Sequence, residues 1–116
     1  MDEALRTRIQ EILDAHPVVL FMKGSRNFPR CGFSATVVEV LKRLDVDFHF
    51  VDVLQDPEVR EGIKEYGSWP TIPQLYLRGE LVGGCDIVRD LFTDGELEPM
   101  VRAALEGPAA GAERAG

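Results

Sequence analysis

The chain has few cysteines, no long apolar run and a shortage of positive charge. Only Cys31 and Cys85 are present, which excludes the dense disulfide framework of small secreted domains and suits a reducing compartment. No stretch approaches the roughly 20 apolar residues that a transmembrane helix needs, so no membrane association is predicted. The acidic start Met1-Asp2-Glu3 resembles neither a secretory signal nor a transit peptide. The composition therefore predicts a cytoplasmic location.

The balance of charge and the scarcity of histidine argue against two further classes. Thirteen basic against twenty acidic residues give a formal charge of −7, which would repel nucleic acid and anionic membranes. His16 and His49 show no metal-ligand spacing with the cysteines, which disfavours a zinc site. With 116 residues, the chain is long enough for one domain with a real core and too short for two.

The first third of the chain alternates between helical and strand patterns. Apolar residues recur at helical spacing over residues 5–13, which predicts a surface helix. This helix must end at His16, because a residue before proline is pushed out of the helical region. The short, all-apolar and β-branched run Val18–Met22 is typical of a strand buried on both faces. A second helix is predicted from about residue 34 to residue 44.

The middle of the chain repeats this pattern. A second strand is predicted over residues 48–53, where apolar residues cluster again. The Asp-Pro-Glu sequence at 56–58 supplies an N-cap, a proline at the first helical position and an acid in the first turn. It predicts a helix through Tyr66 that is closed by Gly67.

The strand connections predict the fold class. Two short apolar runs, 74–77 and 80–82, flank a two-residue turn formed by Arg78 and Gly79, and this pattern predicts an antiparallel hairpin. The two earlier strands are joined through a helix, which implies that they are parallel. The chain is therefore expected to form an α/β domain with a mixed four-stranded sheet and helices on both faces.

The C-terminal third is expected to contribute two helices and a tail. The first helix begins near Asp86, whose carboxylate can cap it, and the second covers about residues 97–105. Residues 107–116 contain no large apolar side chain, so they predict a disordered tail behind a single domain of residues 1–106.

The loop from Lys23 to Ser34 is expected to carry the chemistry. Cys31 lies just before or at the start of the second helix, where free N–H groups and the helix dipole stabilise a thiolate. Lys23 and Arg30 add positive charge nearby. A lone cysteine is usually a small buried hydrophobe, but these polar, cationic and Gly/Pro-punctuated surroundings favour a functional thiol. The position of the second cysteine of a Cys-x-x-Cys motif holds Ser34, so no disulfide can form within the loop.

Other polar and aromatic residues have two interpretations each. Lys23 and Arg60 are either solvated charges or ligand contacts, and Lys23 is favoured because it follows a strand, where open α/β sheets place ligands. Phe33 and Trp69 either pack in the fold or form a wall of a binding site. Cys85 is more consistent with a structural role than with a thiol that resolves a disulfide.

The sequence Cys31-Gly32-Phe33-Ser34, with a lysine eight residues upstream, resembles the monothiol CGFS glutaredoxins of the thioredoxin-like superfamily. The likeness runs from about residue 9 to residue 105 and includes the segments at 69–74 and 83–87. It implies a thioredoxin-like fold with a cis-proline at position 73 that faces the cysteine.

The resemblance also implies a ligand. Proteins of this family bind glutathione non-covalently, and the likeness places the glutathione carboxylates on Lys23 and Arg60. The other contacts implied in this way are Ile72 and Pro73 for the cysteinyl backbone, and Cys85 and Asp86 for the γ-glutamyl end. Phe33 is added to the predicted binding residues as a wall of the site.

The family resemblance further implies a shared cofactor. Two subunits of such proteins hold a [2Fe–2S] cluster through Cys31 of each subunit and the thiols of two glutathiones, so a cluster-bound homodimer is expected. The function implied is assembly, storage and transfer of iron–sulfur clusters to apo-proteins. The loop before the cysteine is longer than in dithiol glutaredoxins, which favours this carrier role.

Two alternatives remain open. The first is a glutathione-dependent oxidoreductase in which Cys31 attacks protein–glutathione mixed disulfides and external glutathione resolves them. The second, weaker alternative is a scaffold for BolA-like proteins, which members of the family bind.

Overall fold

The computed structural model of the protein describes residues 1–107, so the predicted tail at 107–116 lies outside the described residues except for Gly107. Strands in this part of the chain are β1 (Val18–Met22), β2 (His49–Asp52), β3 (Gln74–Leu77) and β4 (Glu80–Gly83). Its helices are α1 (Glu3–Ala15), α2 (Gly32–Arg43), the 3₁₀ helix η1 (Val53–Gln55), α3 (Pro57–Tyr66), α4 (Cys85–Thr93) and α5 (Leu97–Glu106). Among these described helices, none is both long and apolar enough to cross a membrane.

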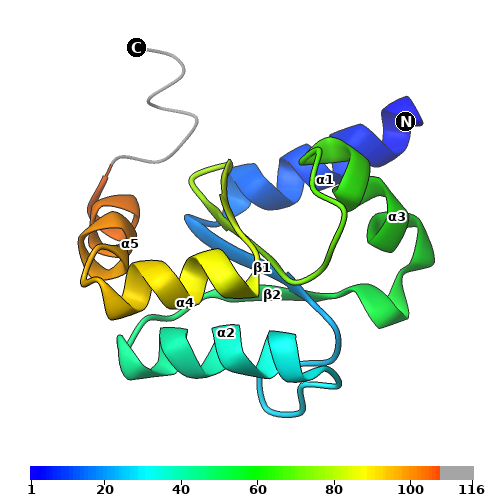
Figure 1. Cartoon of the computed structure of the whole chain (residues 1–116). Coiled ribbons are helices and arrows are strands. Elements are labelled where there is room, and N and C mark those ends of the chain that lie inside the picture. The colour runs from blue at the N-terminus through cyan, green and yellow to red at the C-terminus, as the bar shows by residue number, and fades with distance from the viewer. Residues whose placement is uncertain (108–116) are drawn as a thin grey trace.

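The sheet is mixed, with the strands in the spatial order β2-β1-β3-β4. β1 pairs in parallel with β2, where Leu20 lies opposite Phe50, and antiparallel with β3, where Leu20 lies opposite Leu75. β3 and β4 form the predicted hairpin. Figure 1 shows α1 and α3 on one side of the sheet and α2 and α4 on the other. The predicted mixed sheet with helices on both faces is confirmed.

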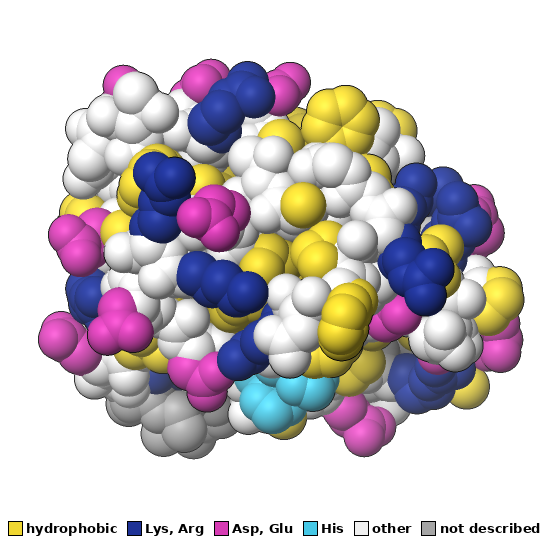
Figure 2. Space-filling model, turned by 90° about the horizontal axis from the view of Figure 1, so that it is seen from below, with side chains coloured by type: hydrophobic (Ala, Val, Ile, Leu, Met, Phe, Trp, Pro, Cys, Tyr) yellow, Lys and Arg dark blue, Asp and Glu magenta, His cyan; other side chains and the backbone are white. Residues whose placement is uncertain are grey.

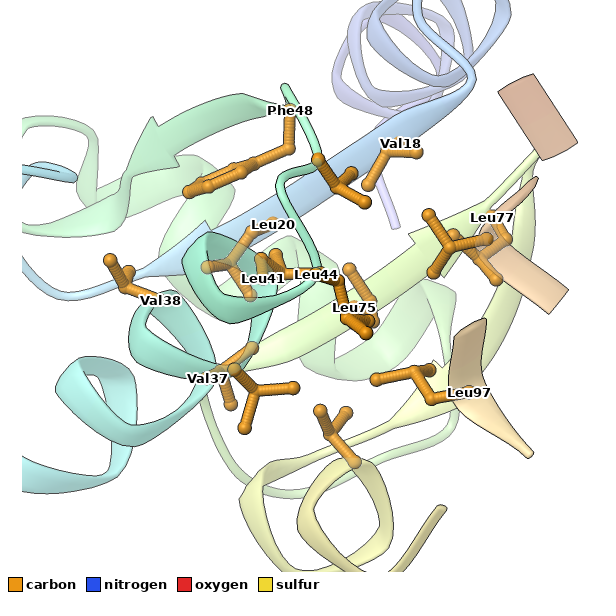
Figure 3. Close-up of a cluster of buried hydrophobic side chains, with 14 of the residues drawn as sticks. Val18, Leu20, Val37, Val38, Leu41, Leu44, Phe48, Leu75, Leu77 and Leu97 are labelled. Carbon is orange, nitrogen blue, oxygen red and sulfur yellow. The ribbon is translucent and has the colours of Figure 1, made fainter. Parts of the chain in front are cut away.

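Alternation along β1 divides the hydrophobic core into two halves. Leu20 and Met22 belong to the cluster that includes residues of α2, α4 and α5, whereas Phe21 belongs to the cluster with α1 and α3. In the first half, Leu41 of α2 lies close to Leu20 and Leu75 of the sheet (Figure 3). All five residues of β1 are buried, as the all-apolar run predicted. This buried strand is a rigid base for the loop that leaves its carboxyl end.

Capping residues determine where the helices beside the cleft begin. Asp56 caps α3 as predicted, because its side chain accepts a hydrogen bond from the Val59 N–H. α2 begins at Gly32, earlier than the predicted start near residue 34, with Cys31 as its N-cap. β2 ends at Asp52 and not at residue 53, because the Asp52 carboxylate accepts a hydrogen bond from the Leu54 N–H and opens η1.

The prediction that Asp86 caps α4 is wrong. The helix begins at Cys85, and Gly84 is its N-cap, with no side-chain hydrogen bond to the helix. Asp86 lies in the first turn, where its carboxylate accepts a hydrogen bond from Arg89 at 3.2 Å. Gly84 already adopts the extended backbone that an N-cap needs, so the chain enters the helix before the acid is reached.

Candidate functional site

A cleft of about 500 Å³ opens where β1 ends and α2 begins. Its walls come from the loop after β1, from α3, from the segment before β3 and from the first turn of α4. The structure brings together in this lining all the residues that the sequence predicted for the site: Lys23, Cys31, Phe33, Arg60, Ile72, Pro73, Cys85 and Asp86. The lining also includes Lys64, Trp69, Pro70, Thr71, Gly84 and Ile87.

Cys31 is a partly exposed, free thiol at the N-cap of α2. Its partial burial acts to raise its pKa, but hydrogen bonds from the backbone N–H groups of Ser34 and Phe33 stabilise the thiolate. The Lys23 charge and the Ser34 hydroxyl act in the same direction, and the net effect lowers the pKa of Cys31 below that of an ordinary thiol. Of the two cations expected to act on the thiolate, Arg30 is exposed and lies outside the cleft lining. The cysteine is therefore more nucleophilic, and a better metal ligand, at neutral pH than a solvated thiol.

Ser34 does more than occupy the place of a second cysteine. Its side chain is fully buried, and its Oγ accepts a hydrogen bond from the backbone N–H of Lys23 at 3.1 Å. This bond joins the end of β1 to the first turn of α2 across the whole loop. The same hydroxyl stabilises the Cys31 thiolate, so one side chain fixes the lysine backbone and acts on the sulfur.

Ser34→Ala is therefore expected to raise the pKa of Cys31 toward that of an ordinary thiol. It also leaves the Lys23 N–H without its acceptor, which should cost about 1–3 kcal/mol of stability. The pH dependence of Cys31 alkylation by iodoacetamide and urea unfolding measure the two effects. Thr36→Ala removes a hydroxyl that bonds to the Gly32 carbonyl in the same helix, and it should leave the alkylation midpoint in place. An unchanged midpoint in Ser34→Ala would show that the hydroxyl does not act on the sulfur.

The segment before β3 forms the wall that lies along the middle of the cleft. Its Ile72–Pro73 peptide bond is cis, as the family resemblance implied. Buried Gln74 holds the preceding residues in place, because its side-chain amide donates hydrogen bonds to the carbonyls of Trp69 and Thr71, each at 3.1 Å. The sequence placed Gln74 in a strand but gave no sign of this anchoring role.

Gly84 allows α4 to approach this wall closely. A Cβ at position 84 would come within 3.2 Å of both the Pro73 carbonyl oxygen and the Trp69 indole nitrogen. The missing side chain therefore leaves room for the first turn of α4 beside the cis-proline. Trp69 lines the cleft, and its buried Nε1 has no hydrogen-bond partner among the described residues.

Three cations line the cleft. Lys23 follows β1, and Arg60 and Lys64 lie one turn apart on α3, so their side chains share one face of that helix. Lys64 also forms an ion pair with Glu61 at 3.3 Å. The sequence analysis missed Lys64, although its spacing of four residues from Arg60 was the signal that could have identified it.

Cys85 differs from Cys31 in its surroundings. It is a free thiol like Cys31, but it is buried and packs in the core cluster on the α2 side of the sheet. This position agrees with the structural interpretation of the side chain, while its backbone forms the start of α4 at the cleft.

The arrangement defines the class of protein. A mixed four-stranded sheet with a cysteine at the N-terminus of its first crossover helix and a cis-proline in the same cleft is the thioredoxin-like fold. The solved structure of the reduced apo form of poplar GrxS14 superimposes on the chain with a TM-score of 0.79, at 48% sequence identity, covering 89% of this chain and 94% of that one.

Comparison with known sequences narrows this class. The glutaredoxin family model matches residues 18–82. The chain is 49% identical over 105 residues to an uncharacterized monothiol glutaredoxin ycf64-like protein of Synechocystis, covering 90% of this chain and 98% of that protein. It is 50% identical over 101 residues, or 87% of its length, to the chloroplastic monothiol glutaredoxin-S7 of Oryza sativa subsp. japonica, of which it spans 60%.

The chain belongs to the glutaredoxin family and is a monothiol glutaredoxin of the CGFS type. This confirms the resemblance that the sequence carried between residues 31 and 34. The relatives include chloroplastic and cyanobacterial proteins, and the cytoplasmic location expected from the composition stays a prediction.

Proposed function

We propose that the protein binds glutathione in the cleft and that two copies share a [2Fe–2S] cluster, which they carry and pass to apo-proteins. The observation that supports this proposal most strongly is the convergence, in one cleft, of a thiol with a lowered pKa, three cations and a cis-proline segment. Apo iron–sulfur proteins are the proposed recipients, and BolA-like proteins are proposed partners through the family resemblance.

The chemistry of glutathione matches the walls of the cleft. Glutathione is an extended tripeptide with two carboxylates and one ammonium group. Lys23, Arg60 and Lys64 offer charge-assisted hydrogen bonds to the glycine carboxylate. The backbone of Ile72 beside the cis-proline offers a strand-like partner to the cysteinyl residue.

The first turn of α4 suits the γ-glutamyl group. α4 starts here without a side-chain cap, so its first N–H groups are available to a carboxylate. Asp86 is exposed in the first turn and can accept hydrogen bonds from the ligand ammonium. A buckwheat glutaredoxin of the same fold has been solved in complex with glutathione, at 22% identity and a TM-score of 0.78, which supports the choice of ligand through the shared fold.

One chain offers too few thiolates to hold a [2Fe–2S] cluster alone, but enough to share one with a second chain. A [2Fe–2S] cluster takes four thiolate ligands. The chain has two cysteines, and Cys85 is buried in the core, which leaves Cys31 as the accessible thiolate. One Cys31 and one bound glutathione thiol from each of two chains make up the four. Because two of these ligands belong to a dissociable small molecule, such a cluster suits transfer as cargo.

The lowered pKa of Cys31 also supports the alternative, a glutathione-dependent oxidoreductase. In that reaction the Cys31 thiolate attacks the glutathione sulfur of a mixed disulfide, a new S–S bond forms, and the target protein leaves as a thiolate. A second glutathione thiolate then attacks the glutathione sulfur bound to Cys31. This step releases oxidised glutathione and restores the Cys31 thiolate.

Two measurements on the same preparation separate these functions. The first is anaerobic reconstitution with iron, sulfide and glutathione, followed by visible absorption and size determination. The second is turnover on a glutathionylated peptide, compared with a dithiol glutaredoxin. The carrier proposal expects a coloured dimer and slow turnover. Rapid turnover without a cluster would establish the oxidoreductase in its place.

A further inference from the structure

The loop before Cys31 is a closed, internally bonded hairpin. The Arg30 N–H donates a hydrogen bond to the Lys23 carbonyl at 2.8 Å, and Ser25 and Phe28 exchange two backbone hydrogen bonds at 3.1 and 3.2 Å. Gly24 at the base has a φ of +94°, and a Cβ there would come within 2.6 Å of the Arg30 backbone nitrogen. The two ends of the loop are therefore held together.

This hairpin is attached to the edge of the sheet at two levels. β2 is an edge strand and runs parallel to β1, so Asp52 lies beside the start of the loop and Phe48 lies near the opposite end of the strand. The Gly24 N–H donates a hydrogen bond to the Asp52 carboxylate at 2.9 Å. Arg26 makes the second attachment at Phe48, near the start of β2, so the loop folds back along the strand edge.

Arg26 makes three interactions near the start of β2, two with Phe48 and one with Asp47. Its guanidinium donates a hydrogen bond to the Phe48 carbonyl oxygen, lies 4.3 Å from the centre of the Phe48 ring and forms an ion pair with Asp47 at 3.1 Å. The Asp47 side chain is 92% exposed, so this ion pair contributes little. The planar guanidinium, which stacks and donates at once, is the anchor, and Phe48 is fixed because it packs in the core.

A pair of stacked histidines lies next to the Arg26 attachment. His16 and His49 stack with their ring centres 3.9 Å apart, and Figure 2 shows the two imidazoles side by side on the surface. The pKa of His49 is lowered by burial and by the charges of His16 and Arg26. Because the Arg26 charge disfavours the imidazolium form, the pKa of His49 depends on the position of residue 26.

We propose that Arg26 is a positioning residue for the cleft: by fastening the hairpin to the sheet edge, it keeps Lys23 and Cys31 in register at the mouth of the cleft. Arg26 itself does not line the cleft, and it acts through the residues at the two ends of the hairpin. Its effect on glutathione rests on the proposed function, whereas its effect on the thiol does not.

The test compares Arg26→Ala and Arg26→Lys with Arg43→Ala. Arg43 is a matched control, because it forms an exposed ion pair with Glu39 on α2 and lies outside the cleft lining. The pH dependence of Cys31 alkylation reports the thiol, whose charged neighbours in the cleft are Lys23, Arg60, Lys64 and Asp86. Calorimetric titration with glutathione reports the ligand, and NMR titration of His49 reports the placement of residue 26.

Arg26→Ala is expected to move the alkylation midpoint upward, because Lys23 and the N–H groups no longer hold their places at the sulfur. Glutathione affinity should fall roughly three- to tenfold. The His49 midpoint should rise, since a positive charge leaves its neighbourhood. Arg26→Lys should behave like Arg26→Ala in the first two measurements, because an ammonium group cannot stack and donate as a guanidinium does. Arg43→Ala should change none of the three.

Two results would overturn the inference. An alkylation midpoint and a glutathione affinity equal to those of Arg43→Ala, in a variant with reduced thermal stability, would limit Arg26 to a structural role. An unchanged His49 midpoint in Arg26→Ala would place the guanidinium away from β2. If the unmodified protein fails to bind glutathione, the proposed function fails, and the alkylation midpoint still decides the role of Arg26. Should Arg26→Ala fail to fold, the alkylation and glutathione criteria apply to Arg26→Lys.

Discussion

Replacing Cys31 with serine is expected to abolish cluster assembly while leaving the fold intact. The substitution removes the only accessible thiolate that the chain offers at the cleft, and a serine hydroxyl cannot replace it because it does not ionise near neutral pH. Cys31 makes no side-chain cap hydrogen bond to α2, and serine is a favourable N-cap residue. The variant should therefore be at least as stable as the natural chain. Visible absorption after anaerobic reconstitution and thermal unfolding measure the two sides of this prediction.

Glutathione binding is the control that distinguishes the loss of the cluster-ligating thiolate from the loss of the glutathione-binding cleft. The contacts proposed for glutathione come from the cations, the cis-proline segment and α4, so Cys31→Ser should retain most of its affinity for glutathione. A variant that still assembles the chromophore would contradict the ligand assignment. Cys85 would then be the remaining thiol to consider, and its burial would have to be relieved.

Reversing the charge of Arg60 is expected to produce the second largest effect. Arg60 lines the cleft on α3 beside Lys64 and faces the same space as Lys23. Arg60→Glu would remove the proposed charge-assisted hydrogen bond to the glutathione carboxylate, worth about 1.5–3 kcal/mol, and add repulsion. Glutathione affinity should fall roughly tenfold or more, which calorimetric titration measures directly. The loss should shrink as salt is added, because screening weakens the repulsion.

Arg43→Glu makes the same change in net charge on α2, outside the cleft lining. It should leave the affinity within about twofold, because a distant exposed charge is screened at physiological salt. Equal losses in the two variants would mean that the ligand responds to the overall field of the protein. An unchanged affinity in Arg60→Glu would remove Arg60 from the binding site.

Local sequence patterns predicted the fold because each element carries its own signal. The all-apolar run at 18–22 could be satisfied only by a strand covered on both faces, and it lies at the centre of the sheet. Asp56 and Pro57 start α3 by capping and by a fixed backbone angle, both of which are readable in sequence. The start of α4 was misplaced because the bare glycine at 84, and not the acid at 86, makes the N-cap there.

Only those residues of the cleft that belong to short sequence motifs could be predicted. Cys31 and the cis-proline follow from short motifs that a family resemblance can carry. Gln74 and Arg26 carry no such motif, because their roles depend on hydrogen bonds that form only in the folded chain. Lys64 was missed although its spacing of four residues from Arg60 is present in the sequence. Gln74 acts through backbone carbonyls that any residue could present, and Arg26 acts through a carbonyl and a ring 22 residues away.

In the proposed function, bound glutathione supplies half of the ligands of a cluster shared by two chains. The most direct measurement is parallel anaerobic reconstitution with glutathione and with dithiothreitol, a thiol without carboxylates, followed by size determination and iron and sulfide analysis. We expect a coloured dimer with one cluster per two chains after reconstitution with glutathione, and a colourless monomer after reconstitution with dithiothreitol. A cluster of the same yield and size in dithiothreitol, or one cluster per monomer, would contradict this expectation.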